Sequence, residues 1–96
     1  MAKRFFPSFE SEANDFAATK LRLGEYGVIR VGGVRYNVVP MKDKTTLNIG
    51  DNVFTRAGGN YGIYSIIAIE DRWFYLGKKE KKKGRVVRAD IFGKVI

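Results

Sequence analysis

The chain has 96 residues, no Cys, no His and a formal net charge of +8 at pH 7. This composition excludes disulfides, thiolate zinc sites, Cys nucleophiles and Ser-His-Asp triads, and the length fits one globular domain with one small core. Residues 1–71 hold nine Lys and Arg against eight Asp and Glu, whereas residues 72–96 hold nine against two. The excess positive charge therefore lies in the last quarter, which predicts one basic surface.

The N-terminal residues 1–23 show no strand alternation. Ser8 or Ser11 can cap a short helix. Its shared face would comprise Phe9, Ala13, Phe16 and Lys20. An arm that packs its phenylalanines on the rest of the domain, an arm that stays disordered and a partner-binding arm are the alternatives. The basic start is followed by Pro7 and acidic residues in place of an apolar segment, so we expect neither secretion nor membrane insertion.

From Glu25 the hydrophobic pattern changes to a period of two. Residues 26–31 and 34–39 are two β-rich runs, and Gly32 with Gly33 between them suits a two-residue hairpin turn. Pro40 ends the second run because it brings no amide hydrogen to a strand ladder. Residues 41–50 form a polar excursion of the length of a long loop.

The central stretch, residues 50–76, predicts three strands with short turns between them. The strands are 52–56, 61–69 and 72–76, the first turn is Ala57 to Asn60, and the second is Glu70 with Asp71. Both faces of 61–69 are largely apolar, which favours a strand covered on two sides. We expect Ile63 or Ile67 in the core, and Trp73 as a core residue.

The C-terminal part begins with the lysine-rich segment 78–84, KKEKKKG. A strand at 85–89, a 3₁₀ turn at 90–92 and a short strand at 94–96 are expected to follow. Five to six short strands at spacings near ten residues predict an all-β fold, a small barrel, with an N-terminal arm or short helix. The expected division is an arm at 1–23 and a single barrel at 24–96.

The run from Gly50 to Ile69 resembles a KOW motif, the strand-loop-strand element of SH3-like barrels in NusG-type elongation factors and several ribosomal proteins. The matching residues are Gly50, Asp51, Val53, Thr55, Gly58, Gly62 and Ile67; Ser65 stands where such motifs place a further glycine. The upstream segment GVIRVGGVRYNVV is similar to the strand pair that opens the OB-type domain of NfeD-like membrane proteins. The resemblances imply a small SH3-like or OB-like barrel.

The supply of catalytic groups is thin. Without His the commonest general base is missing, and adjacent Glu70 and Asp71 are poor candidates for a paired acid-base site. The glycines at 58, 59 and 62 lack the Lys-Ser/Thr that a phosphate loop needs. We therefore expect no enzyme, no cofactor and no metal.

The remaining feature is a set of basic residues interleaved with aromatic residues. The basic residues are Arg72, Lys78, Lys79, Lys81, Lys82, Lys83, Arg85 and Arg88, and the aromatic residues are Tyr61, Tyr64 and Tyr75. Cations track a phosphate backbone and rings offer stacking faces, although a lysine-rich loop is also typical of a solvated hairpin tip. The sequence favours a nucleic-acid-binding accessory or regulatory protein, with DNA and RNA both open, in the cytoplasm or associated with a virion or nucleoid. The alternative is a protein-interaction module or assembly adaptor that docks through the N-terminal arm or the C-terminal tail.

Overall fold

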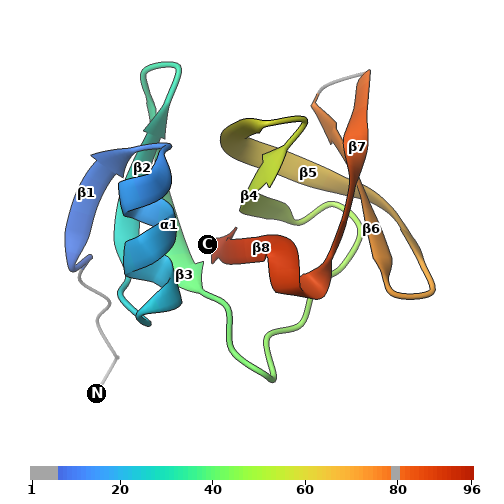
Figure 1. Cartoon of the computed structure of the whole chain (residues 1–96), viewed down its shortest axis with the longest axis horizontal. Helices are drawn as coiled ribbons and strands as arrows, with labels where there is room; N and C mark the ends of the chain where they lie inside the picture. The colour runs from blue at the N-terminus through green and yellow to red at the C-terminus, as the bar shows by residue number, and fades with distance from the viewer. Residues whose placement is uncertain (1–6, 79–80) are drawn as a thin grey trace.

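One sheet of eight strands dominates the computed structural model, which describes residues 7–78 and 81–96, with only the backbone at Lys78 and 81–83. In chain order the elements are β1 (Phe9–Glu12), α1 (Asp15–Arg22), β2 (Gly27–Val31), β3 (Val34–Pro40), β4 (Asn52–Ala57), β5 (Asn60–Glu70), β6 (Trp73–Lys78), β7 (Lys81–Val87), the 3₁₀ turn η1 (Arg88–Asp90) and β8 (Ile91–Val95). The strand order is β1-β2-β3-β8-β4-β5-β6-β7, an open sheet with β1 and β7 at its edges (Figure 1). The mainly β class with one short helix is confirmed, but five to six strands was too low a number.

The N-terminal region contributes a strand that the sequence pattern did not predict. β1 pairs in parallel with β2, and the Ser8 amide donates a hydrogen bond to the Tyr26 carbonyl oxygen at 2.6 Å. Parallel neighbours need a crossover, and α1 supplies it by packing across one face of the sheet (Figure 1). Phe9 is buried over Gly27, where a Cβ would lie only 2.2 Å from the ring. Phe9 is therefore a sheet residue, and its expected place on a helix face was wrong.

The helix begins at Asp15 and is capped by Asn14. The Asn14 backbone is extended, and its side-chain oxygen accepts a hydrogen bond from the Ala17 amide at 3.2 Å. The predicted caps were wrong, because Ser8 precedes β1 and Ser11 lies within it. The buried helix residues are Ala17, Ala18 and Leu21, whereas Phe16 remains 51% exposed. The helix therefore presents a different face to the sheet from the predicted one.

Two of the predicted turns are confirmed by their backbone angles. Gly32 and Gly33 have φ values of 57° and 81°, and Gly58 and Gly59 have 60° and 84°. Positive φ at both central residues is typical of the two-residue turn that matches the twist of a β-hairpin. The third reversal lies at 71–72, one residue later than predicted, and places Asp71 at a φ of 58°.

Strand β8 joins the two halves of the sheet. It pairs with β3 on one side and with β4 on the other, so that Gly93 lies between Pro40 and Phe54. A Cβ at Gly93 would lie 2.5 Å from Val38 Cγ1 and 2.7 Å from the Val39 carbonyl oxygen. The strand starts at Ile91, earlier than the predicted 94, and the 3₁₀ turn precedes it at 88–90, earlier than predicted.

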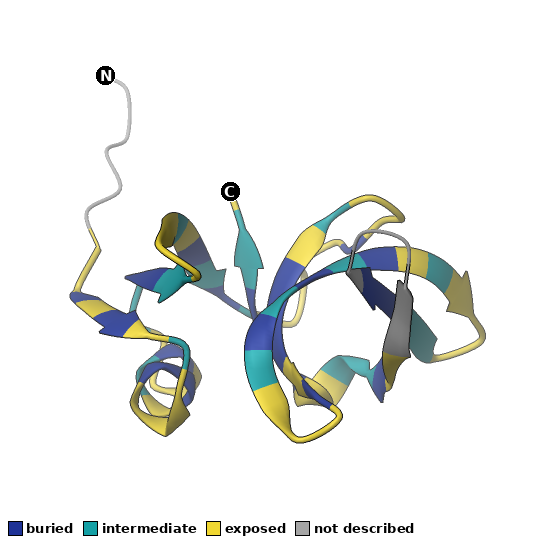
Figure 2. Ribbon diagram, turned by 90° about the horizontal axis from the view of Figure 1, so that it is seen from above, coloured by how far each residue is buried: buried dark blue, intermediate teal, exposed yellow. Residues whose placement is uncertain are grey.

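Two hydrophobic clusters lie on opposite faces of the sheet. The helix-side cluster comprises Phe9, Ala17, Ala18, Leu21, Ile29, Val38 and Phe54. The hairpin-side cluster comprises Leu47, Val53, Ala57, Tyr64, Ile66, Leu76, Val86 and Ile91, around which β4 to β7 curl (Figure 2). Neighbouring Val53 and Phe54 in β4 are both fully buried because successive side chains of a strand point to opposite faces.

The face of β5 that enters the hairpin-side cluster carries Tyr64 and Ile66. Ile63 is half-buried against the helix-side cluster, and Ile67 is 43% exposed, so the expectation of a core residue at Ile67 was wrong. A β-bulge between Ile66 and Ala68 shifts the pairing with β6. An extra residue in one strand breaks the simple alternation on which the prediction depended.

Replacing Ile66 with Ala should lower the free energy of unfolding by about 2 to 5 kcal/mol, because the side chain is 1% exposed and its loss leaves a cavity. The adjacent Ile67→Ala is the matched control and should change stability by less than about 1 kcal/mol. Chemical denaturation of both variants measures the difference. Equal losses would contradict the assignment of the two faces of β5.

Replacing Gly93 with Ala should destabilise the protein by about 1 to 3 kcal/mol, because backbone at Val39 blocks the added methyl group. Gly62→Ala is the control, since a Cβ at this buried strand position meets its nearest neighbour, the Tyr64 ring, at 3.4 Å. Thermal unfolding of the two variants tests this. A melting temperature for Gly93→Ala at or above that of Gly62→Ala would show that β8 does not need the close approach.

Candidate nucleic-acid interface

The hairpin of β6 and β7 brings aromatic and basic side chains together on one face. Tyr75 pairs with Arg85 and Trp73 pairs with Val87. Because side chains alternate along a strand, Leu76 enters the hairpin-side cluster and Tyr75 with Arg85 lies on the opposite, outer face. The sequence prediction named both Tyr75 and Arg85, and the structure makes them cross-strand neighbours.

Trp73 also belongs to this outer face. The Arg85 guanidinium carbon lies 4.4 Å from the centroid of the Trp73 ring, within the range of a cation-π contact. Trp73 is half-buried and belongs to neither buried cluster, so its expected place in the core was wrong. Hydrophobicity alone favoured a place in the core for Trp73. On the outer face of the strand, however, the Arg85 guanidinium covers its ring in place of core side chains.

The other predicted cations of this region lie at the two ends of the hairpin. Arg72 is exposed in the turn between β5 and β6. Lys78 pairs with Lys81 at the far end of the strands, where the lysine-rich segment lies. Lys79 lies outside the described residues, and so do the side chains of Lys78, Lys81, Lys82 and Lys83. β6 has six residues, which separates Arg72 from the lysines by about 20 Å.

Tyr64 lies inside the molecule, away from the outer face of the hairpin. It is 5% exposed, and its hydroxyl donates a hydrogen bond to the Asn60 carbonyl oxygen at 3.0 Å. Burial raises the pKa of this phenol above its ordinary value. Its ring contributes to packing in the hairpin-side cluster.

Tyr61 lies on the helix side of the sheet. Its hydroxyl donates a hydrogen bond to Asp15 Oδ1 at 2.5 Å, and this bond, helped by desolvation, raises the pKa of the phenol. Its ring stacks on Phe54 at 5.8 Å between centroids and lies 5.9 Å from Phe92. A cavity of about 180 Å³ lies beside Tyr61 and Phe92, with Arg22 at its rim. This aromatic group joins α1 to the helix side of the sheet.

Arg88 is engaged by the loop that follows β3. Its Nη2 donates hydrogen bonds to the carbonyl oxygens of Lys42 at 2.8 Å, Asp43 at 3.3 Å and Thr45 at 2.6 Å. One guanidinium nitrogen therefore satisfies three backbone acceptors of a long connection. This contact could not be predicted from the sequence, because its partners lie more than forty residues away.

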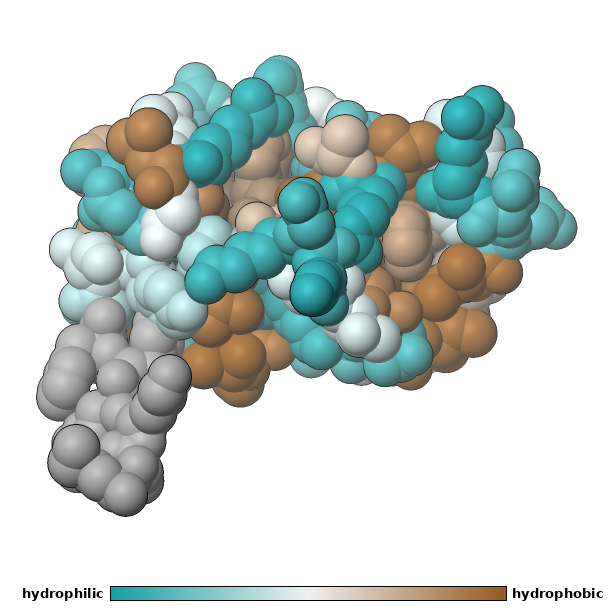
Figure 3. All heavy atoms as spheres, turned by 90° about the horizontal axis from the view of Figure 1, so that it is seen from below, coloured by the Kyte–Doolittle hydropathy of each residue, from teal (hydrophilic) through white to brown (hydrophobic). Residues whose placement is uncertain are grey.

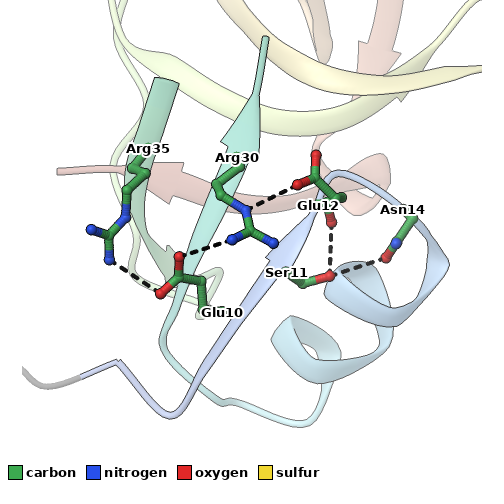
Figure 4. A network of polar contacts seen from close by, with 6 residues as sticks. All are labelled: Glu10, Ser11, Glu12, Asn14, Arg30 and Arg35. Atoms are coloured by element: carbon green, nitrogen blue, oxygen red, sulfur yellow. Dashed lines mark hydrogen bonds and ion pairs between the residues drawn. The ribbon is translucent and has the colours of Figure 1, made fainter. Parts of the chain in front are cut away.

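Four of the nine described Lys and Arg residues outside the hairpin have a carboxylate partner. On the outer face of β1 to β3, Glu10 joins Arg30 at 3.3 Å and Arg35 at 3.1 Å (Figure 4). Glu12 Oε2 lies 3.0 Å from Arg30 Nε, an ion pair without the alignment of a hydrogen bond. Lys20 pairs with Glu25 and Lys94 pairs with Asp51, each at 3.5 Å. Exposed pairs of this kind contribute little stability, but they balance the charge of their surface.

In the part of the chain that the structure describes, no carboxylate lies within ion-pair distance of Arg72 or Arg85.

The same part of the chain holds no cluster of three or more residues suited to bind a metal ion. Its single α-helix is eight residues long, too short and too polar to cross a membrane. No protein family, curated protein or solved structure matches this chain.

Replacing Arg88 with Ala should lower the free energy of unfolding by about 1 to 3 kcal/mol, because three carbonyl groups lose their donor. Arg85→Ala removes the same side chain from an exposed site and should cost less than about 1 kcal/mol. Urea denaturation of the two variants compares them. If Arg85→Ala proved the more damaging, the division between a structural and a surface arginine would be wrong.

Proposed function

We propose that this chain is a non-catalytic nucleic-acid-binding protein, an accessory or regulatory factor that contacts the phosphate backbone through the β6–β7 hairpin. The observation that carries the proposal is the concentration of positive charge in one hairpin, because residues 72–87 hold seven Lys and Arg against a single acidic residue, Glu80. Among the described residues, Arg72 and Arg85 have no carboxylate partner. A surface with unbalanced positive charge attracts an anionic polymer.

The proposed contact consists of the hairpin and its turn. It comprises Arg72, Tyr75, Lys78, Lys79, Lys81, Lys82, Lys83 and Arg85. Arg88 serves the loop after β3, Tyr64 is buried and Tyr61 lies on the helix side, so these three stay outside the proposed contact. Arginine grips phosphate with two nitrogens and also stacks on bases, which makes Arg85 the strongest single contact.

We also propose that β4 to β8 represent a small SH3-like barrel with a KOW-type element, with an OB-like arrangement as the alternative. The curl of β4 to β7 around one hydrophobic cluster supports this (Figure 2). So does the hairpin at Gly58 and Gly59, at the place where the KOW resemblance puts its loop. Such barrels host many functions, so the proposed ligand depends on the charge and not on the fold.

A protein-interaction module is the second candidate, favoured by the open edges of the sheet at β1 and β7. The exposed apolar side chains include Leu23, Ile49 and Ile96. On the face shown in Figure 3, however, hydrophobic areas are separated by hydrophilic side chains. Scattered apolar residues are ordinary on a protein surface, so a nucleic acid is the preferred partner.

The proposal predicts that Lys82→Gln combined with Lys83→Gln weakens binding to unrelated nucleic-acid sequences about equally. The slope of log K against log salt should become shallower by up to about two units, because each lysine that meets a phosphate releases a counterion. Anisotropy titrations at several salt concentrations measure both effects, on DNA and on RNA.

The matched control is Lys42→Gln with Lys44→Gln, which removes the same charge from the loop after β3. This pair should leave the slope nearly unchanged, because the loop lies outside the proposed contact. Equal effects of the two pairs would show that binding depends on general charge attraction and not on a defined surface. Absence of binding to either polymer at low salt would reject the proposed function.

A further inference from the structure

The outer face of β5, β6 and β7 is organised in two rows of side chains. The pairing registers define one row as Ala68, Tyr75 and Arg85, and the other as Glu70, Trp73 and Val87. Two diagonal contacts join the rows. The Arg85 guanidinium carbon lies 4.4 Å from the centroid of the Trp73 ring, and the Tyr75 hydroxyl donates a hydrogen bond to Glu70 Oε1 at 3.0 Å. Both rings thus have a fixed position on the sheet.

This face is open, whereas the opposite face of the same strands is buried. Ile66, Leu76 and Val86 lie in the hairpin-side cluster and are at most 5% exposed. All six members of the two rows are exposed or half-buried. A shallow cavity of about 290 Å³, lined by Ala68, Ile69, Glu70 and Tyr75, leaves space beside the tyrosine ring. The Tyr75 ring therefore has open space beside it, and both half-buried rings lie on a packed support.

Basic residues lie within this aromatic surface and at its ends. Arg85 lies within it, Arg72 follows the end of β5, and Lys78 and Lys81 pair through their backbones at the other end of the hairpin. The distance of about 20 Å between the two ends spans several nucleotides of an extended strand. Rings between two groups of cations match a polymer that alternates flat bases with phosphates.

We infer that the outer face of β5, β6 and β7, which we call the stacking face, binds single-stranded nucleic acid by stacking bases on Tyr75 and Trp73. The inference rests on the proposed function and narrows its ligand to a single strand. A duplex hides the flat surfaces of its bases in its own stack, so it could use the cations but not the rings. A single strand can use both.

The test uses the fact that Trp73 is the only tryptophan of the chain. Oligothymidylate and oligouridylate of about twelve nucleotides, within the usual range of site sizes, are titrated against the full chain. The Trp73 fluorescence should be quenched on binding of a single strand. A duplex of matched length should bind about tenfold more weakly at the same salt concentration.

Variants then separate stacking from charge. Tyr75→Leu should weaken single-strand binding roughly five- to hundredfold, several times more than it weakens duplex binding, whereas Trp73→Phe retains a ring and should retain most of the affinity. Tyr36→Leu, a half-buried tyrosine of β3, makes the same change away from the stacking face and is the control. Labelled oligonucleotides report affinity without the tryptophan, and the melting temperature of each variant shows that it is folded.

The outcomes distinguish the inference from the proposed function. Salt-dependent binding with equal affinity for duplex and single strand, unchanged fluorescence and full affinity in Tyr75→Leu would overturn the inference and leave backbone binding intact. Failure to bind either polymer at low salt would reject both. Fluorescence quenching together with selective loss of single-strand affinity in Tyr75→Leu supports the stacking face.

Discussion

The close approach of three elements at Gly93 is the constraint on which the rest of the structure depends. β8 is the only described strand that pairs with both β3 and β4, so it alone makes one sheet of two halves. β8 fits between them because position 93 has no side chain: atoms of Leu21 in the helix, of Val38 and of the Val39 carbonyl all lie within 3.2 Å of where a Cβ would be. The helix can therefore rest directly on the joint, and one glycine sets the distance between α1, β3 and β8.

A short chain gains two hydrophobic clusters from this arrangement. At the joint, β4 is covered on both faces, with Val53 in one cluster and Phe54 in the other. Each cluster alone is small, but a shared strand makes packing on one face depend on packing on the other. The outer face of the hairpin belongs to neither cluster, which is why Trp73 and Tyr75 remain only half-buried there.

The turns and the charge distribution could be predicted from the sequence because both are local properties. Paired glycines at 32–33 and 58–59 specify positive φ by themselves. β1 could not be predicted in this way, since it exists through parallel pairing with β2 across an intervening helix. The predicted core positions of Ile67 and Trp73 were wrong for related reasons. A bulge shifts the strand that carries Ile67, and the Arg85 cation covers the ring of Trp73. Of the candidate site, the sequence indicated the basic residues, but only tertiary structure separates Arg85 on the surface from Arg88 in the loop.

The position of β8 in the chain has a consequence for folding during synthesis. A ribosome produces the strands of both halves before it produces the strand that lies between them. Until then β3 and β4 lack their shared neighbour and leave hydrogen-bonding edges unpaired, the state in which nascent β proteins are most prone to associate with other chains. Joining the halves also closes contacts of long sequence separation, such as Val38 with Val95, which slows folding relative to a helical domain of this size. The complete sheet therefore forms late, when its middle strand joins the two halves.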